Sequence, residues 1–300
     1  MDLLQLKYFQ TVARTEHITR AAAQLHIAQP SLSKVITRLE EDLGVCLFDR
    51  QGRQIKLNHY GRAFLCRVDR IFAELEDGKR ELSDMIGNDN SKVTIASNNI
   101  SLFSKLLEGY LKLYPHTNFH QMIGTTAEMQ QQLENGTADL CISSPPIEGP
   151  GIEYIPLFTE EVYLIIPQDH KFANRTDINL IEAANEPFIS LKEGFGMRDL
   201  TEKFCHEAGF NPNIVFESDI STKSVDLVNI GVGVGLHPIP PWSDLTDIHP
   251  VILHIKEPVC SRTIALSFTQ NRYLSLAAKQ FKDYTIHYFK DFEHSNNIIV

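Results

Sequence analysis

The residues with the clearest chemistry lie on one predicted helix over residues 29–43. The apolar positions Leu32, Val35, Ile36, Leu39 and Leu43 recur at the three- and four-residue spacing of a single helix face. Hydrogen-bonding and cationic side chains, with a proline suited to a first helical turn, occupy the other face: Gln29, Pro30, Ser33, Lys34, Thr37 and Arg38. Amide and hydroxyl groups can read DNA base edges, whereas Lys and Arg mainly contact phosphates. The pattern therefore predicts a helix that packs by one face and presents the other to DNA.

Two shorter patterns precede this helix and are expected to position it. Leu3 to Ala13 carries apolar residues at helical spacing, which predicts a first helix. Thr19 is expected to cap a second helix over residues 20–26, and the small side chains of Ala21 to Ala23 allow another helix to cross closely. Together the three segments predict a helix-turn-helix.

A basic hairpin is predicted directly after the helix. Gly44 is a plausible helix end. Two short extended runs then flank the turn residues Gln51-Gly52, with Arg50, Arg53 and Lys56 at or near the tip. This arrangement predicts a β-wing beside the helix-turn-helix.

Residues 3–61 resemble the winged helix-turn-helix of LysR-type transcriptional regulators. The matching residues are Leu6 and Phe9, then Thr19, Ala21, Ala22 and Leu25, then Gln29-Pro30-Ser31-Leu32-Ser33, then Ile36, Leu39 and Glu40, then Leu43-Gly44-Val45, Leu47, Phe48 and Arg50, and finally Leu57 and Gly61. One departure is Ala28, because the family often has a serine there that caps the helix. Ala28 has no side-chain acceptor with which to do so.

The resemblance implies DNA contacts for particular residues. It places Gln29, Pro30, Ser33, Lys34 and Arg38 in or beside the major groove, and Arg53 in an adjacent minor groove or on phosphate. The alternative is that this polar surface is the solvated helix face of an ordinary domain, and for Thr37 that alternative stands about equal.

A second helical pattern follows over residues 61–87. Its apolar seam alternates spacings of four and three, as in a coiled coil: Phe64, Val68, Ile71, Leu75, Gly78, Leu82 and Met85. In the resembling family this linker helix dimerises two DNA-binding domains, which implies two DNA half-sites. The alternative is an edge helix that packs only on its own domain. We therefore expect a DNA-binding domain over 1–60 and a dimerising helix over 61–87.

The remaining residues, 88–300, predict an α/β domain. A polar, turn-rich segment over 87–91 is followed by alternating strand-like and helical runs. The resemblance implies a fold similar to periplasmic binding proteins, with two lobes and a ligand cleft between them. We expect lobe one over 92–161 and 269–300, and lobe two over 162–268.

Polar residues at the predicted strand-to-helix junctions are the candidate effector contacts, because free backbone N–H groups gather there. They are Ser97, Asn98, Thr125, Thr126 and Ser144 in lobe one, where the resemblance supports them most, and Lys192, Arg198, Ser221 and Thr222 in lobe two. Lys192 and Arg198 favour an anionic effector such as a carboxylate. Each hydroxyl taken alone could instead be a helix cap, and the two cations could be solvated surface residues.

Charge and composition set limits on other functions. Residues 1–60 carry eight Lys or Arg against six Asp or Glu, whereas the whole chain has a net charge of −10. Long-range attraction to DNA is therefore modest, and two copies of the module are expected. The five cysteines, Cys46, Cys66, Cys141, Cys205 and Cys260, form no C-x-x-C pair, so we expect reduced thiols.

No motif argues for a metal, a cofactor or catalysis. The glycines Gly231, Gly233 and Gly235 are followed by Leu236 where a dinucleotide loop needs glycine, so we interpret them as a tight turn. Peroxide-sensing relatives use two cysteines in a mobile segment where this chain offers only Cys205. We find neither a signal-like N-terminus nor a membrane-length apolar run, and we expect a cytoplasmic protein.

The order of parts predicts a LysR-type regulator that binds promoter DNA and responds to a small-molecule effector, as a dimer or, preferably, a homotetramer. The rival hypothesis is an α/β enzyme or solute-binding protein whose N-terminal helices dock another protein.

Overall fold

The computed structural model describes residues 1–51, 54–86, 92–98, 100–219, 221–239, 250–270 and 272–296. The chain divides into two compact units, one of Met1–Gly87 with Glu134–Thr137 and one of Asn88–Leu133 with Ala138–Val300. Within the described ranges, no helix is both long and apolar enough to cross a bilayer.

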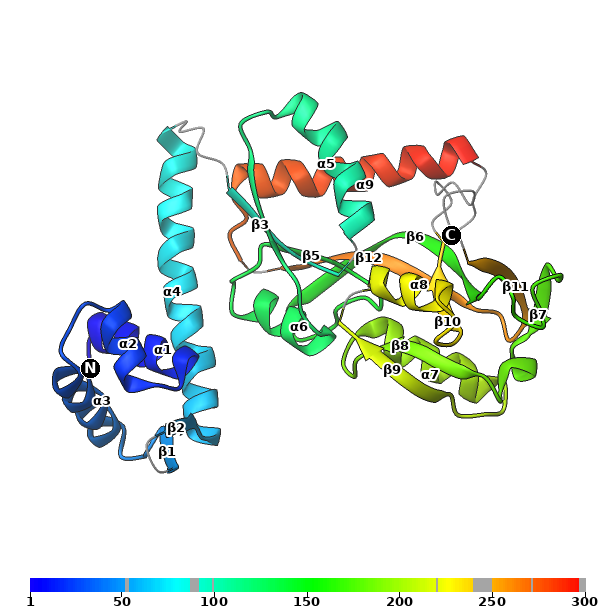
Figure 1. Cartoon of the computed structure of the whole chain (residues 1–300). Coiled ribbons are helices and arrows are strands. Elements are labelled where there is room, and N and C mark those ends of the chain that lie inside the picture. The colour runs from blue at the N-terminus through cyan, green and yellow to red at the C-terminus, as the bar shows by residue number, and fades with distance from the viewer. Residues whose placement is uncertain are drawn as a thin grey trace. The chain divides into compact units, whose positions relative to one another are not determined.

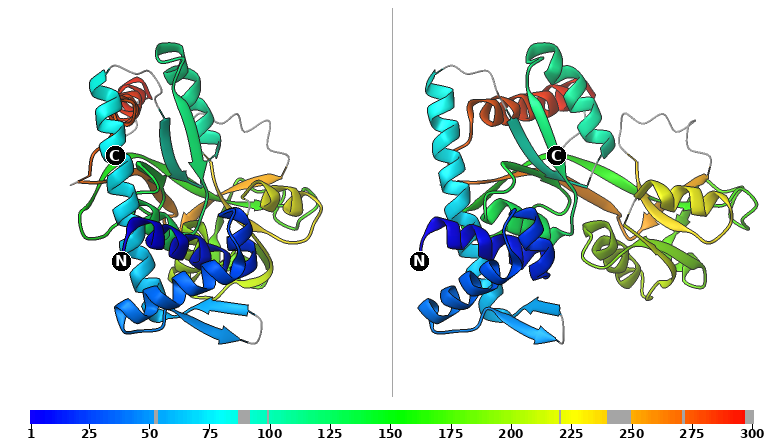
Figure 2. Two further views of the ribbon diagram at one scale, coloured as in Figure 1. Left: turned by 90° about the vertical axis from the view of Figure 1, so that its left-hand side faces the viewer. Right: turned by 60° about the vertical axis from the view of Figure 1, so that its left-hand side comes forward.

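The smaller unit is a helical bundle with a hairpin (Figures 1 and 2). Its elements are α1 (Leu3–Thr15), α2 (Ile18–Gln24), α3 (Gln29–Leu43), β1 (Phe48–Gln51), β2 (Gln54–Leu57) and α4 (His59–Ile86). One core joins the three short helices to the hairpin and the start of α4. Phe9 lies at its centre, fully buried, with ring centroids 5.7 Å from Phe48 and 5.1 Å from Phe64.

The second helix starts one residue earlier than the predicted cap Thr19. His17 is the N-cap, because its backbone is extended and its ring nitrogen accepts a hydrogen bond from the Arg20 amide at 3.4 Å. Thr19 therefore lies inside α2, and the prediction that it caps the helix was wrong. Ala21 and Ala22 are buried as expected, where α2 packs between α1 and α3.

The seam of α4 has two parts with different surroundings. Phe64 and Val68 pack into the core of their own unit, and Val68 is fully buried. Further along, Ile71, Leu75, Leu82 and Met85 are exposed, by 61% at Leu82 and 74% at Met85. The first part of this 28-residue helix therefore packs on its own domain, as one alternative predicted, and its second part leaves an apolar seam exposed, as the other predicted.

The larger unit is built on a mixed sheet. The order of hydrogen-bonded strands is β4-β3-β5-β12-β6-β11-β7, with β10 also paired to β6 and with a separate β8-β9 pair. The strands are β3 (Lys92–Ser97), β4 (Asn118–Met122), β5 (Leu140–Ser143), β6 (Ile152–Ile166), β7 (Asp177–Asn179), β8 (Pro187–Leu191), β9 (Asn213–Ser218), β10 (Gly235–Pro238), β11 (Val251–Glu257) and β12 (Ser261–Thr269). The helices are α5 (Ile100–Leu113), α6 (Thr126–Glu134), the short η1 (Leu180–Ala183), α7 (Gly196–Glu207), α8 (Ser221–Asn229) and α9 (Leu276–Asn296).

Separate cores define two lobes within this unit. In the first lobe, α5 and α9 cover one face of strands β3, β5 and β12, and α6 covers the other. The second lobe has a core of its own around Leu164, Phe188 and Leu253. Ile264 to Phe268 fall within the range predicted for lobe two, yet their buried side chains pack in the core of lobe one, because β12 pairs with the first part of β6.

Phe9→Ala should destabilise the smaller unit by about 3–5 kcal/mol, because it removes a fully buried ring from a close-packed core. Leu4→Ala on the same helix is the matched control. Leu4 is 59% exposed, so its change should stay within about 0.5 kcal/mol. Urea unfolding of the full chain measures both, and equal losses would contradict the assigned core.

Candidate DNA-binding surface and effector site

The helix α3 presents two distinct faces. Leu32, Ile36 and Leu39 are buried in the core, with at most 5% of each side chain exposed. On the other face Gln29, Pro30, Lys34 and Arg38 are exposed and Ser33 is half-buried. Among the described residues, no ion pair engages Lys34 or Arg38. The donors predicted to contact DNA therefore lie together on the solvent side of one helix.

The residues at the two ends of α3 explain where the helix begins and ends. Ala28 is the N-cap and makes no side-chain hydrogen bond, as expected from its methyl group. Pro30 lies in the first turn, where a missing N–H costs little. Gly44 ends the helix with a left-handed φ of 72°, a conformation that favours glycine.

Two carboxylates attach the hairpin to the helices. The Glu40 carboxylate, on α3, accepts hydrogen bonds from the Leu47 and Phe48 amides at 2.7 and 3.3 Å. The Glu16 carboxylate, at the end of α1, accepts one from the Leu57 amide at 2.9 Å. These bonds fix where each hairpin strand leaves the bundle, so they position the wing relative to α3.

The hairpin itself pairs as a tight antiparallel ribbon, from Phe48 opposite Leu57 to Gln51 opposite Gln54. Lys56 on β2 is exposed. The predicted DNA contact Arg53 lies outside the described residues, as does the side chain of Arg50. Their contribution to the DNA-binding surface remains a prediction from sequence.

In the larger unit, the predicted junctions of lobe one lie close together. Ser97 is fully buried at the end of β3, and its carbonyl accepts a hydrogen bond from the side-chain Nε2 of Gln121 at 3.1 Å. The next residue, Asn98, donates to the Gly124 carbonyl at 2.7 Å. Asn98 therefore ties the end of β3 to the loop that leads to Thr125 and Thr126.

Thr125 is a helix cap, the alternative raised for each predicted hydroxyl. Its hydroxyl accepts from the Glu128 amide at 3.2 Å, and the Glu128 carboxylate accepts from the Thr125 amide at 2.8 Å, which is a reciprocal capping box on α6. Thr125 still lies at the junction, but its role as a cap is sufficient to explain why a hydroxyl is found there.

Lobe two brings one loop to the same place. The Thr126 amide donates to the Gly194 carbonyl at 2.9 Å, so the segment between β8 and α7 touches the start of α6. Ser144, which precedes Pro145 through a cis peptide bond, lies against Gly196 of the same segment. Thr125, Thr126 and Ser144 thus lie against the loop that follows Lys192. Asn98 is joined to that place through Gly124, and Ser97 lies one residue before Asn98.

The two predicted cations of lobe two have different environments. Lys192 is exposed and pairs with Asp219 at 3.3 Å. Arg198 is buried and is held by the carboxylates of Glu202 and Glu217, and it also donates to the Leu191 carbonyl at 3.2 Å. Its guanidinium is therefore neutralised within lobe two. Ser221 begins α8, but the side chains of Ser221 and Thr222 lie outside the described part of the chain.

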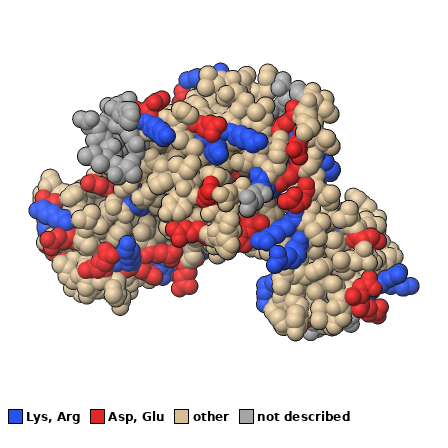
Figure 3. All heavy atoms as spheres, turned by 180° about the vertical axis from the view of Figure 1, so that it is seen from behind, with Lys and Arg blue, Asp and Glu red and all other residues tan. Residues whose placement is uncertain are grey.

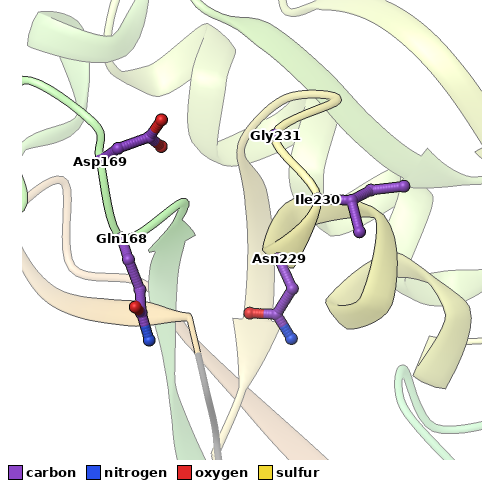
Figure 4. A pocket seen from close by; sticks show the side chains of 5 residues that line it. All are labelled: Gln168, Asp169, Asn229, Ile230 and Gly231. Atoms are coloured by element: carbon purple, nitrogen blue, oxygen red, sulfur yellow. The ribbon is translucent and has the colours of Figure 1, made fainter.

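Two hollows are recorded in lobe two. One of about 540 Å³ is lined by Gln168, Asp169, Asn229, Ile230 and Gly231, where the end of α8 faces the residues after β6 (Figure 4). None of the predicted effector residues lines it. The other, of about 760 Å³, lies between α7 and β9, and its wall includes Arg198 with Glu202 and Glu217.

The described residues contain no cluster of metal ligands, and three of the five thiols are buried. No group of three or more His, Cys, Asp or Glu side chains there could hold a metal ion. Burial raises the pKa of the Cys141, Cys205 and Cys260 thiols to about 12 each, so they are protonated at neutral pH. A protonated thiol is a poor nucleophile toward peroxide.

The glycines Gly231, Gly233 and Gly235 were predicted to form a tight turn, and the structure has a turn at Gly231. Gly231, with a φ of 82°, turns the chain at the end of α8, and strand β10 begins at Gly235. The element that begins at the last of these glycines is a strand, whereas a dinucleotide-binding turn leads into a helix.

Comparison with known proteins identifies the family. The model of the bacterial regulatory helix-turn-helix protein, lysR family, matches residues 3–62, and that of the LysR substrate binding domain matches residues 90–290. The chain belongs to the LysR family of transcriptional regulators. Its helix-turn-helix is a DNA-binding domain, and its larger unit is the family's effector-binding domain.

Similar regulators span the whole chain. The uncharacterized HTH-type transcriptional regulator YybE of Bacillus subtilis is 37% identical over 97% of this chain and 100% of its own length. The transcriptional dual regulator GltC of the same organism is 33% identical over 98% and 99%. These relatives are regulators, so the rival enzyme hypothesis is not supported.

Solved structures agree with the fold of this regulator. CbnR, a LysR family transcriptional regulator, superposes with a TM-score of 0.68 at 23% identity, over 96% of this chain and 99% of its own. The effector binding domain of QuiR, solved in complex with shikimate, superposes with a TM-score of 0.61 at 26% identity, over 67% of this chain and 98% of its own. The predicted two-lobed, periplasmic-binding-protein-like architecture is confirmed.

Glu40→Ala should destabilise the smaller unit by about 1.5–3 kcal/mol, because two amides at the start of the wing lose a charged acceptor. Glu41→Ala, next to it on the exposed side of α3, should change stability by less than about 0.5 kcal/mol. Thermal unfolding of the full chain compares the two. If Glu41→Ala proved as costly as Glu40→Ala, the hydrogen bonds of Glu40 would not be what positions the wing.

Proposed function

We propose that this regulator binds promoter DNA through α3 and the wing and responds to a small carboxylate effector at the junction of its two lobes. The observation that carries the effector proposal is the convergence of the junction residues: Asn98 bonds to Gly124, Thr126 bonds to Gly194, and Ser144 lies against Gly196. Three segments of lobe one and one of lobe two thus meet where parallel strands end. This is the usual position of ligands in open α/β sheets.

A carboxylate is favoured by the groups available at this junction. The N-terminus of α6 lies at this junction, and a helix N-terminus attracts negative charge. Lys192 adds an exposed cation two residues from Gly194, whereas Arg198 is neutralised by Glu202 and Glu217 and is assigned a bracing role instead. The similar QuiR domain was solved with shikimate, a hydroxylated carboxylate, which supports the same chemical class here.

The proposed DNA contacts are Gln29, Pro30, Ser33, Lys34 and Arg38 on α3, with Arg53 on the wing. The exposure of Gln29, Pro30, Lys34 and Arg38 on one face of α3 supports their assignment. Figure 3 shows acidic side chains spread over the larger unit on the face in view, in keeping with the charge count of the sequence. Attraction to DNA must then come from the smaller unit, which is why we assign both base and phosphate contacts to it.

We propose a dimer formed through the exposed part of the α4 seam, assembled further into a tetramer in the cytoplasm. The domains that follow from this assignment are a DNA-binding domain over 1–60, a dimerising helix over 61–87 and an effector domain over 88–300. A row of exposed Ile71, Leu75, Leu82 and Met85 on one long helix supports pairing with a second copy. Two DNA-binding domains would then read two half-sites.

The proposed response is a shift between quaternary arrangements. An effector that binds one arrangement of the lobes more tightly increases its population, and the spacing of the DNA-binding domains changes with it. Coupling of this kind is typically about 1–3 kcal/mol.

DNA binding is tested by gel shift on the region upstream of the protein's own gene. Gln29→Ala should reduce the preference for the specific site, because an amide that reads base edges is lost, whereas Arg53→Ala should weaken binding to all sequences about equally. With about 6–10 phosphate contacts, affinity should fall roughly 10³–10⁵-fold between 50 and 200 mM salt. Absence of binding at low salt, with and without metabolites, would refute the DNA-binding proposal.

Leu82→Asp should weaken self-association of the full chain roughly tenfold or more, because burying a leucine side chain is worth about 1.5–3 kcal/mol. Lys79→Ala, one turn away and off the seam, is the control and should leave association unchanged. Sedimentation equilibrium measures both variants. If Leu82→Asp associated as tightly as the wild-type chain, this seam would not be the interface.

Small carboxylates, beginning with shikimate, should raise the melting temperature of the full chain. A ligand at 100 times its dissociation constant stabilises by about 2.7 kcal/mol, which is readily detected. Lys192→Ala should reduce the shift given by each active carboxylate. A screen in which only neutral compounds stabilise the chain would contradict the proposed effector class.

A further inference from the structure

The segment Gly194-Phe195-Gly196 of lobe two lies directly on lobe one, and we call it the strap. It connects β8 to α7. One of its contacts is a backbone hydrogen bond from the Thr126 amide to the Gly194 carbonyl, at 2.9 Å. The other is the close approach of Gly196 to the Ser144 carbonyl and the Pro145 ring. Both contacts join different lobes, and each includes a backbone carbonyl oxygen.

Glycine is required at both ends of the strap for different reasons. A Cβ at position 196 would overlap the Ser144 carbonyl oxygen and the Pro145 Cδ. Gly196 has no left-handed φ, so the requirement is one of space alone. Gly194 has a φ of 85°, and a Cβ there would lie 3.1 Å from the Thr125 methyl carbon. The absence of two side chains thus lets the lobes approach to hydrogen-bonding distance.

Lobe two braces the strap from behind. The Lys192 amide donates to the Ser218 carbonyl at 2.9 Å, and the Arg198 amide donates to the Phe195 carbonyl at 2.8 Å. The buried Arg198 guanidinium also donates to the Leu191 carbonyl at 3.2 Å while Glu202 and Glu217 hold it. With its base fixed in this way, the strap can move away from lobe one only if lobe two moves with it.

We propose that the strap is the device that closes the two lobes, and that it competes with the effector for the Thr126 amide. An amide has one hydrogen to donate, and here the Gly194 carbonyl accepts it. A carboxylate at the N-terminus of α6 would have to displace this carbonyl to reach the Thr126 amide. Gly196 is accordingly a positioning residue, because its lack of a side chain brings the Gly194 carbonyl to the amide. This inference rests on the proposed effector site and adds how that site is regulated.

Residue-resolved hydrogen exchange on the full chain tests the strap. The amides of Thr126 and Met129 are both in α6, but Thr126 donates across the lobes and Met129 donates to the Thr125 carbonyl within its own helix. In Gly196→Ala the Thr126 amide should exchange roughly tenfold faster or more, in line with the cost of overpacking a close contact, while Met129 stays protected. Glu193→Ala is the control, because this exposed residue adjoins the strap but takes part in neither of its contacts with lobe one.

Two results would overturn the proposal. One is a Thr126 amide that exchanges in the wild type as fast as an unprotected amide. The other is unchanged Thr126 exchange in Gly196→Ala while strands β6 and β11 keep their protection. Loss of protection throughout lobe two would indicate misfolding of that variant, and a cysteine pair then decides.

The pair Thr125→Cys with Gly194→Cys provides the second measurement. A Cβ at 194 would lie 3.3 Å from the Thr125 Cβ, close to the span of roughly 3.5–4.5 Å across a disulfide. Mild oxidation of the full chain should join the two cysteines, as shown by peptide mapping, and added Gly196→Ala should slow the reaction roughly tenfold. Cysteine at 194 must adopt the left-handed φ of 85°, and Thr125 caps α6, so protection of the Met129 amide is followed as a check on the fold. Failure of the pair to join while Met129 stays protected and both thiols react with maleimide would refute the strap.

The same proteins in a gel shift separate this inference from the proposed function. A chain that binds its upstream DNA but has no protected Thr126 amide would refute the strap alone. A chain that binds no DNA would refute the regulator proposal whatever the exchange result.

Discussion

The larger unit depends on one strand, β6, that belongs to both lobes. Its 15 residues pair with β12 from Ile152 to Glu161, and with β10 and β11 from Val162 to Ile166. Phe158 packs in the first core and Leu164 in the second, six residues apart on one extended chain. A continuous strand cannot shift its register in one lobe without exposing the side chains it buries in the other. The lobes are therefore linked by a segment whose pairing is fixed, while loops at the junction remain able to meet or part.

A buried ion pair lies where β6 passes between the cores. Glu160 and Arg262 are opposite each other in the register, and the Arg262 guanidinium donates to the Glu160 carboxylate at 2.6 Å. The second carboxylate oxygen of Glu160 is buried and has no hydrogen-bond partner among the residues that the structure describes. Burial, opposed by Arg262, leaves the pKa of Glu160 raised. An incompletely bonded buried pair adds little to stability. The pair does penalise any strand register that separates Glu160 from Arg262. We therefore infer that it selects the pairing register of β6 with β12 and adds little to the stability of the sheet.

Sequence patterns predicted the features that depend on neighbouring residues. The two faces of α3, the C-terminal role of Gly44 and the turn at Gly231 follow from local spacing and backbone preference, and the structure contains each of them. Arg198 shows the limit of such prediction, because the Glu217 carboxylate that pairs with it belongs to strand β9, whereas Arg198 lies on helix α7. No local sequence pattern indicates that pairing. The cap of α2 was missed for a related reason: histidine is an uncommon cap, and Thr19 offered a commoner one two residues later. The strap was not predictable, because the need for glycine at 196 arises from Ser144, which is distant in the sequence.

The strength of the strap suits a reversible role. A backbone hydrogen bond contributes about 0.5–1.5 kcal/mol net, and the contact at Gly196 adds close packing without a side chain to bury. A bias of that size is comparable with the 1–3 kcal/mol typical of coupling between sites. A contact much stronger than this would hold the lobes closed against any small ligand, and a much weaker one would leave the closed arrangement unpopulated. The bond that closes the lobes uses the Thr126 amide, which a bound carboxylate would also need. Closure of the lobes and binding of the effector therefore compete for the same hydrogen-bond donor.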